Sequence, residues 1–541
     1  MPLETEPTQY QSAIKKKTGH GGPGLGTSYL LGVALSGGGH RATLFGLGVL
    51  MAMRDAGREP RQISSVSGGS ITNAVLARNY FARIPHDMKG MSIDEFWMSE
   101  TKALFDTVVS KGILTKCWII ALMVLMALPL LALVLLAPPW YVTVPVVVLE
   151  LIMFHLRGLL VEWLISRRFF GDAPKKVHIE DLHNKNTELA VEHVICCTDL
   201  ITGCPLYAST RNGGHIYRVH EDRPLGVGPR TTMPWDEVKK MSNIGIQCVS
   251  EKLTVPTLLR ASAGFPGIPP RRVKLTPRDS DAHPEGVKRV PSVAFLSDGG
   301  IWSNLATQPF EDGYLWGEDG PWVVVVSDAS APLRYVSPFV FHVAGVAEIL
   351  ALWRQGVILM KNTVAPRRLQ YHDQIRREIV AARSSRHDVE RLYPVVSSVE
   401  TPRDVVERLL QNGGWPDMNQ TYLADSERER REEKRAVTRI RAKRLVQTVE
   451  EVTTEERSYV QKVQIDSEAA EKLKTLHELA GGERGAEAED LVAFFPTTLD
   501  RVDQKVALAL VRRGYANTSL TLYLLGLTDK LFVPSGWLNE F

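Results

Sequence analysis

A strand-to-helix turn at Ile63–Ser70, ISSVSGGS, constrains the fold more than any other stretch of this sequence. A β-branched run leads into Ser67, two glycines follow at once, and an apolar, helix-compatible run continues to Phe81. The residue after the serine of such a turn must be tiny, because a side chain there would collide with the opposing backbone. The pattern predicts a nucleophile elbow, which aims a hydroxyl at a helix N-terminus where backbone N–H groups stabilise negative charge.

One position departs from the usual elbow pattern G-x-S-x-G, because Ser65 stands where its first glycine is expected. A Cβ at this position adds crowding to the turn. Taken alone, the stretch therefore fits equally a Ser/Gly-rich loop that joins a strand to a helix.

A second glycine-rich turn, Gly37–Gly39, separates a predicted buried strand at 28–35 from an apolar helical run. Glycines at a helix start expose several N–H groups to the positive end of the helix dipole, which suits an anion. The turn has neither the G-K-[ST] end of a P-loop nor the spacing of a dinucleotide-binding fingerprint. An oxyanion hole is the use that fits best, and a tight turn without a ligand is the alternative.

The two residues after these glycines have side chains that could take part in chemistry or in hydrogen bonding. His40 is either a base or an exposed turn residue. Arg41 has a simpler structural use, since its guanidinium can hold the glycine loop open by hydrogen-bonding its carbonyls.

Two aspartates are candidates for the acid partner of a serine. In VAFLSDGGIWSN a predicted strand, Val293–Leu296, delivers Asp298 into a Gly-Gly turn, where the carboxyl can be closely approached. Asp199 heads the turn TDLITG between two further predicted strands, a position from which an aspartate usually bonds its own backbone. The same ordinary use is the alternative for Asp298.

The most apolar stretch, Trp118–Ala137, runs for 20 residues without a charge. A helix of this length spans the ~30 Å hydrocarbon core of a bilayer. A second apolar run, Val142–Leu156, carries Glu150. Basic residues flank the pair on both sides, which favours two cytoplasmic ends. We expect a membrane hairpin, spanning or re-entrant; the alternative is a buried hydrophobic hairpin or an apolar lid.

Composition narrows the function classes. The net charge of +3 across 541 residues gives no sign of a nucleic-acid partner. The five cysteines lack a metal-ligand spacing with histidines, so neither a metal site nor a disulfide framework is expected. The N-terminus has no apolar core of a signal peptide.

Three motifs in fixed order resemble the patatin-like phospholipase family. GGGHR is similar to its G-G-G-x-R/K oxyanion segment, SVSGG to its G-x-S-x-G elbow, and SDGG to its D-G-G/A motif. CCTDLITG, LLRASAGFPGIPP and TTLDRVDQKVALALVRRGY also look like family segments. The resemblance covers roughly Leu31–Gln308, outside the hydrophobic insertion, and a piece near Thr497–Tyr515.

The resemblance implies a three-layer α/β/α fold and a Ser-Asp dyad in place of a triad. Ser67 would be the nucleophile, and Asp298 would take its proton with a pKa raised by an apolar pocket. The N–H groups of the Gly37–Gly39 turn and Gly68 would hold the oxyanion, with Arg41 in support. The substrate would be a phospholipid or another acyl-ester lipid, hydrolysed through an acyl-enzyme without metal or cofactor. The hairpin would hold the catalytic domain at the cytoplasmic face of a membrane.

The expected organisation has four parts, and the sequence says nothing of oligomeric state. They are a flexible lead-in (1–26), a catalytic domain (27–110 and 173–330), an inserted transmembrane or re-entrant hairpin (111–172) and a mainly helical C-terminal region (331–541) that packs on or extends the catalytic domain.

Two other functions remain open from the sequence. An α/β-hydrolase with a Ser-His-Asp triad would need a histidine after Asp298, such as His342 or His372, and its elbow normally follows several strands, whereas Ser67 follows only the second predicted one. A catalytically silent membrane scaffold or lipid-binding protein would keep the fold without the chemistry.

Overall fold

A computed structural model describes the parts of the chain that build the predicted sheet and the helices around it. The described residues are 31–82, 91–113, 128–171, 177–182, 191–220, 244–249, 253–277, 292–311, 321–330, 358–372, 392–405, 467–480 and 492–538, with short gaps inside several of these ranges.

In the described part of the chain, an eleven-stranded mixed sheet forms the centre, in the order β11-β10-β1-β2-β3-β4-β5-β6-β8, with β9 paired to β3 and β7 paired to β9. Its five parallel strands adjoin one another, and strand pairing is antiparallel from β3 onward. The strands are β1 (Leu31–Leu35), β2 (Gln62–Ser65), β3 (Glu192–Asp199), β4 (Cys204–Ser209), β5 (His215–His220), β6 (Ile244–Val249), β7 (Arg271–Lys274), β8 (Thr276–Pro277), β9 (Val293–Asp298), β10 (Val323–Asp328) and β11 (Val395–Ser397).

The central strands read as continuous apolar runs because both faces of the sheet are covered. Every residue of β1 and of β10 is buried, as expected of parallel strands between layers. The predicted α/β class is confirmed. The predicted strands near 28–35 and 293–296 correspond to β1 and β9.

One edge of β3 is shared by two strands that approach from opposite directions. β2 runs parallel to the first half of β3 and stops with Ser65 opposite Ile195. β9 runs antiparallel to the second half and stops with Asp298 opposite Cys197. The turns that follow β2 and β9 therefore face each other across a single position of β3.

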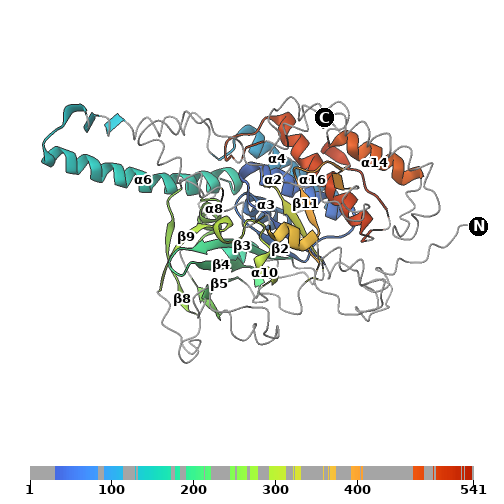
Figure 1. The fold of residues 1–541 in the computed structure, drawn as a ribbon, viewed down its shortest axis with the longest axis horizontal. Helices are drawn as coiled ribbons and strands as arrows, with labels where there is room; N and C mark the ends of the chain where they lie inside the picture. Colours follow the sequence, from blue (N-terminus) through green and yellow to red (C-terminus); the bar gives the residue numbers. More distant parts are fainter. Residues whose placement is uncertain are drawn as a thin grey trace, which may run out of the picture.

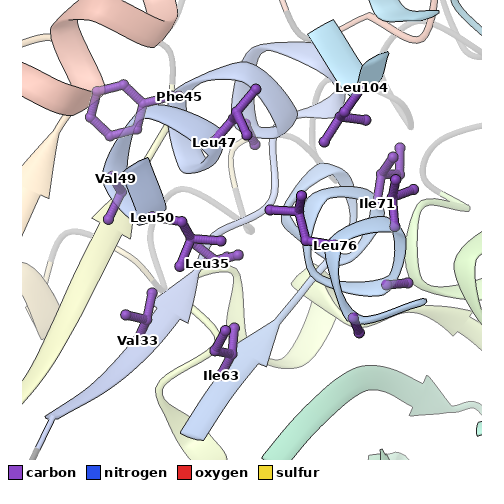
Figure 2. Packing of buried hydrophobic residues seen from close by; sticks show 14 of the residues in the cluster. Val33, Leu35, Phe45, Leu47, Val49, Leu50, Ile63, Ile71, Leu76 and Leu104 are labelled. Carbon is purple, nitrogen blue, oxygen red and sulfur yellow. The ribbon is translucent and has the colours of Figure 1, made fainter. Parts of the chain in front are cut away.

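Helices α2 (Gly39–Asp55), α3 (Gly68–Leu76), α4 (Ile93–Ser110) and α16 (Gln504–Leu524) gather on one side of the sheet in Figure 1. The core between strands and helices is aliphatic (Figure 2): Val33, Leu35 and Ile63 point toward Leu47, Leu50, Ile71, Leu76 and Leu104.

Helices α2 and α16 approach each other closely at glycines. A Cβ on Gly48 would lie 2.0 Å from the carbonyl oxygen of Val511, and one on Gly514 would lie 2.3 Å from that of Phe45. Residues 504–524 are therefore part of the layer that covers the central strands.

The region beyond residue 330 is less uniformly helical than predicted. It contributes α14 (Ser467–Leu479) and α16, and also β11, which pairs with β10 and extends the sheet. This strand has only three residues, two valines and a serine, which is too short to stand out among helical patterns. The sequence predicts helical stretches at 339–359 and 426–444, which lie almost entirely outside the described residues.

The predicted membrane hairpin is not supported. No helix among the described residues is long and apolar enough to cross a membrane, and most of Trp118–Ala137 lies outside them. Residues from 140 onward form one helix, α6 (Trp140–Phe169), which extends away from the body of the molecule (Figure 1). Its second half carries charges because it packs against protein: Val161 and Ile165 are buried in the core, and Glu162 pairs with Arg260.

Candidate functional site

Ser67 stands at a strained turn between β2 and α3. Its φ and ψ are 52° and −121°, and it is one of three non-glycine residues with positive φ in the described part of the chain. Such strain persists where the surroundings enforce it, commonly at functional sites. Ser67 is 8% exposed, and its backbone N–H donates to Ser262 Oγ at 2.9 Å. The predicted strand, elbow and helix are present in the predicted order.

The glycines after Ser67 allow the elbow to pack against the upstream glycine turn. A Cβ on Gly68 would lie 1.8 Å from the carbonyl oxygen of Gly39, and one on Gly69 would lie 2.5 Å from that of Leu35. A Cβ on Gly37 would lie 3.3 Å from the Cβ of Ser67. Two turns that are separate in the sequence thus form one structure around the serine.

The amides of these turns differ in whether they are already used. Gly37 donates its N–H to the carbonyl of Asn304 at 2.9 Å, so the prediction that it contributes to an oxyanion hole does not fit the structure. Within the described part of the chain, the N–H groups of Gly38, Gly39 and Gly68 have no acceptor. They are at the N-termini of α2 and α3, where the helix dipole adds positive potential.

Asp298 is buried at the end of β9, with 2% of its surface exposed. Its Oδ1 accepts the N–H of Gly300 at 2.7 Å, and Thr198 Oγ1 donates to its backbone carbonyl at 2.8 Å. A Cβ on Gly299 would lie 2.4 Å from the Cys196 carbonyl oxygen and 3.3 Å from Cγ2 of Val66. The DGG turn therefore packs directly against the residue that precedes Ser67.

The charge at Asp298 affects a neighbouring thiol. Burial raises the pKa of Cys197, and the Cys196 thiol and the Asp298 carboxyl raise it further. The Cys197 thiol is therefore a protonated core group opposite Asp298 and is not a nucleophile.

His40 is a structural residue. It is fully buried, where an exposed turn residue or a base was considered from the sequence, and its Nε2 lies 2.9 Å from the carbonyl oxygen of Leu499. That carbonyl also accepts the N–H of Ile113. Burial lowers the pKa of His40 to about 4, opposed by the hydrogen bond to Leu499 and reinforced by the charge of Arg168. The imidazole is therefore neutral at pH 7.

Arg41 also connects α2 to distant parts of the chain. It is fully buried, and its guanidinium donates to the carbonyl of Phe495 at 3.0 Å and to Ser398 Oγ at 2.6 Å. The expectation that it bonds carbonyls of the glycine loop is replaced by these contacts. Its support of the site is indirect, through the segments that pack behind α2.

Asp199 has the ordinary structural use considered for it. Its carboxylate accepts the N–H of Ile201 at 3.1 Å and the hydroxyl of Thr202 at 3.1 Å, and it forms a fully buried ion pair with Arg218 at 2.5 Å. These bonds close the turn between β3 and β4.

Ser65 has a purpose of its own in the strand before the elbow. Its hydroxyl donates to the carbonyl of Val194 at 2.9 Å and accepts from Asn73 Nδ2 at 2.8 Å. Asn73 continues the network to His193 Nδ1 at 2.7 Å. The residue that departs from the usual glycine therefore ties β2 to β3 and to α3.

Two residues at the site have no role in the sequence-based prediction, Ser262 and Asn304. Ser262 lies in LLRASAGFPGIPP, which resembles a family segment, so a signal existed without an assigned use. Asn304 carries no pattern, because its contact to the glycine turn depends on the fold. Among the described residues no group of three or more His, Cys, Asp or Glu could hold a metal ion.

Comparison with known proteins gives little. No family model and no curated protein matches the chain. Among solved structures, the human GIVD cytosolic phospholipase A2 is similar over 62% of this chain and 50% of that one, with 9% sequence identity and a TM-score of 0.31. The chain thus spans about half the length of that protein, and the similarity is too weak to carry a conclusion about activity.

Proposed function

We propose that this chain is a serine hydrolase that cleaves acyl esters of lipids, of the phospholipase A type, through a dyad of Ser67 and Asp298. The observation that carries the proposal is the packing of three turns against one another: the strained elbow at Ser67, the glycine turn at 37–39 and the DGG turn at 298–300. The resemblance of these same motifs to patatin-like phospholipases supports the lipid class.

In the proposed mechanism the Ser67 hydroxyl oxygen attacks the ester carbonyl carbon while Asp298 accepts the hydroxyl proton. The carbonyl oxygen becomes an oxyanion, which the N–H groups of Gly38, Gly39 and Gly68 stabilise. Collapse of this intermediate breaks the ester C–O bond, and the leaving alcohol takes the proton from Asp298. A water molecule then hydrolyses the acyl-enzyme by the same steps and releases a fatty acid.

Helix α6 is the proposed contact with a lipid surface. Along most of its length α6 exposes apolar and aromatic side chains that a monomeric protein in water rarely gathers in one place. They are Trp140, Tyr141, Val142, Val144, Val147, Val148, Leu149, Ile152, Leu156, Leu159 and Trp163. Arg167 is exposed near the C-terminal end of α6 and suits an anionic headgroup. We infer that α6 holds the site at the cytoplasmic face of a membrane.

A fluorophosphonate probe tests the nucleophile, because it reacts covalently with activated serines. The full chain is expected to be labelled and to release fatty acid from phospholipid vesicles, and Ser67→Ala to do neither. Ser64→Ala is the matched control, since Ser64 is buried in β2, just before the elbow, and contacts the Cys196 thiol at 3.4 Å. A folded wild-type chain that never labels would refute the proposal and favour a silent scaffold.

A Ser-His-Asp triad requires a histidine and the Ser-Asp dyad does not, so replacing the candidate histidines distinguishes the two mechanisms. His342 lies outside the described residues. His372 is described, and it follows Tyr371, whose hydroxyl donates to Thr307. His342→Ala and His372→Ala are each expected to retain hydrolysis. Complete loss of activity in either variant, with the fold intact, would replace the dyad.

A further inference from the structure

We propose that Ser262 is a positioning residue that holds the Ser67 elbow in its reactive conformation and fixes it relative to Asp298. The proposal rests on the proposed function, because it concerns the geometry of the same nucleophile. It is carried by hydrogen bonds that converge on one buried hydroxyl.

The hydroxyl of Ser262 is fully buried at the C-terminal end of α8 (Val255–Ser262). It donates its proton to the carbonyl of Cys196 at 2.7 Å. Its oxygen is then an acceptor for the backbone N–H of Ser67 at 2.9 Å and for the hydroxyl of Ser70 at 3.0 Å. A hydroxyl has one donor and two acceptor positions. The three hydrogen bonds of Ser262 therefore use all of them.

The bond to Ser67 matters because that residue is both strained and buried. A buried N–H without a partner destabilises the fold, and positive φ is a second unfavourable term for a non-glycine residue. Ser262 removes the first cost only while Ser67 keeps its elbow conformation. The contact therefore favours the conformation that aims the nucleophile.

The bond to Cys196 links the elbow to the acid. Cys196 lies between Ile195, where β2 ends, and Cys197, which pairs with Asp298. The carbonyl of Cys196 is also the group that a Cβ on Gly299 would meet at 2.4 Å. Through one carbonyl, Ser262 fixes Ser67 to the position on β3 where the DGG turn packs.

Helix α8 is itself held by α6, which fixes the position of Ser262. The hydroxyl of Thr257 donates to Glu162 at 2.6 Å, and Arg260 pairs with the same carboxylate at 3.3 Å. Gly158 leaves the space for this guanidinium, since a Cβ there would lie 2.0 Å from an Arg260 Nη atom. The helix that exposes apolar residues thus contacts the helix that positions the nucleophile.

The test compares Ser262→Ala with wild type on a water-soluble short-chain ester, which needs no lipid surface. We expect kcat to fall by about 10- to 100-fold with KM within about twofold, because a displaced nucleophile slows the chemical step more than binding. The rate of fluorophosphonate labelling should fall in parallel. Ser262→Cys retains the shape with a weaker hydrogen-bonding group, and its kcat should lie between the two.

Ser64→Ala is again the matched control, since it removes a buried hydroxyl from β2, the strand before the elbow, and should leave kcat unchanged. A Ser262→Ala chain that labels and turns over at the wild-type rate would overturn the positioning role and leave the proposed function standing. If Ser262→Ala unfolds at the assay temperature, Ser262→Cys decides, and a wild-type kcat in that variant overturns the role. Absence of labelling in wild type would instead remove the proposed function.

Discussion

Ser65 and Asp298 end two strands that meet along the same edge of β3, opposite Ile195 and Cys197. Because these partners are two positions apart, the turns that carry Ser67 and the DGG motif cannot separate without breaking sheet hydrogen bonds. The turns that carry the proposed nucleophile and base are therefore held near each other by strand register and not by flexible loops.

Replacement of the proposed base should separate catalysis from stability. Asp298→Asn keeps an oxygen that can accept the Gly300 N–H but removes the carboxylate that accepts a proton. We expect kcat to fall by at least ~100-fold, the usual size of a general-base effect, with a melting temperature close to wild type. Initial rates on the soluble ester and thermal unfolding measure the two quantities.

The same substitution at Asp199 provides the control. Asp199→Asn leaves the buried Arg218 guanidinium without its carboxylate, which typically costs about 3–5 kcal/mol. Here stability should fall, and activity per folded molecule should remain. A stable but inactive Asp199 variant would instead indicate that Asp199 is the base and Asp298 the structural residue.

Restoring the usual elbow glycine should weaken this protein. Ser65→Gly removes the bonds to Val194 and Asn73 and adds backbone freedom inside a strand. The expected loss is about 1–3 kcal/mol in the free energy of unfolding, measured by urea denaturation. Ser65→Ala should lose most of the same energy, and an equal or higher stability in either variant would contradict the structural use of this hydroxyl.

His40 should make stability depend on pH in the acid range. Its pKa is lowered to about 4 in the folded chain, against about 6.5 in the unfolded one. The unfolded chain binds the extra proton first, so this contribution is complete above pH 6.5 and is lost as pH falls toward 4. The loss is about 3 kcal/mol.

His40→Gln isolates this effect, because the amide can still donate to Leu499 and does not titrate. The difference in unfolding free energy between wild type and His40→Gln should narrow or reverse from pH 7 to pH 4. A difference independent of pH would show that the imidazole is not neutral and buried.

Charge on α6 should weaken binding to lipid without affecting chemistry. Leu149 is 57% exposed on α6, and Leu369 is 54% exposed elsewhere. Leu149→Glu is expected to reduce co-sedimentation with anionic phospholipid vesicles, whereas Leu369→Glu should bind as wild type does. Both variants should hydrolyse the soluble ester normally. Equal sedimentation of the two would reject α6 as the contact.

The sequence predicts the local parts of this site better than their connections. Strand, turn and helix around Ser67 follow from β-branched residues before two glycines, and the same logic holds for Gly37–Gly39. Nothing local indicates that Asp298 arrives antiparallel on β3, because register depends on pairing between strands that are distant in the chain. The resemblance to a family implied a Ser67–Asp298 dyad but not this strand pairing, which comes from the structure.

Other features lay beyond local pattern for physical reasons. His40 was interpreted as a base or an exposed turn residue, and Arg41 as a support for the glycine loop, but Leu499, Phe495 and Ser398 from distant parts of the chain bond these buried side chains. The apolar run at 142–156 indicated a membrane span. Hydropathy does not distinguish a helix that crosses a bilayer from an exposed helix that packs against the protein at one end.

The contacts behind the glycine turn have a consequence for synthesis of the chain. The backbone N–H of His40 donates to Thr498 at 2.7 Å, and the His40 ring bonds a residue 459 positions later. When Ser67 and Asp298 have already emerged from the ribosome, the residues that hold the glycine turn in place have not yet been released. We therefore expect esterase activity to begin only as residues 498–524 emerge, so that an unfinished chain does not act on the lipids around it.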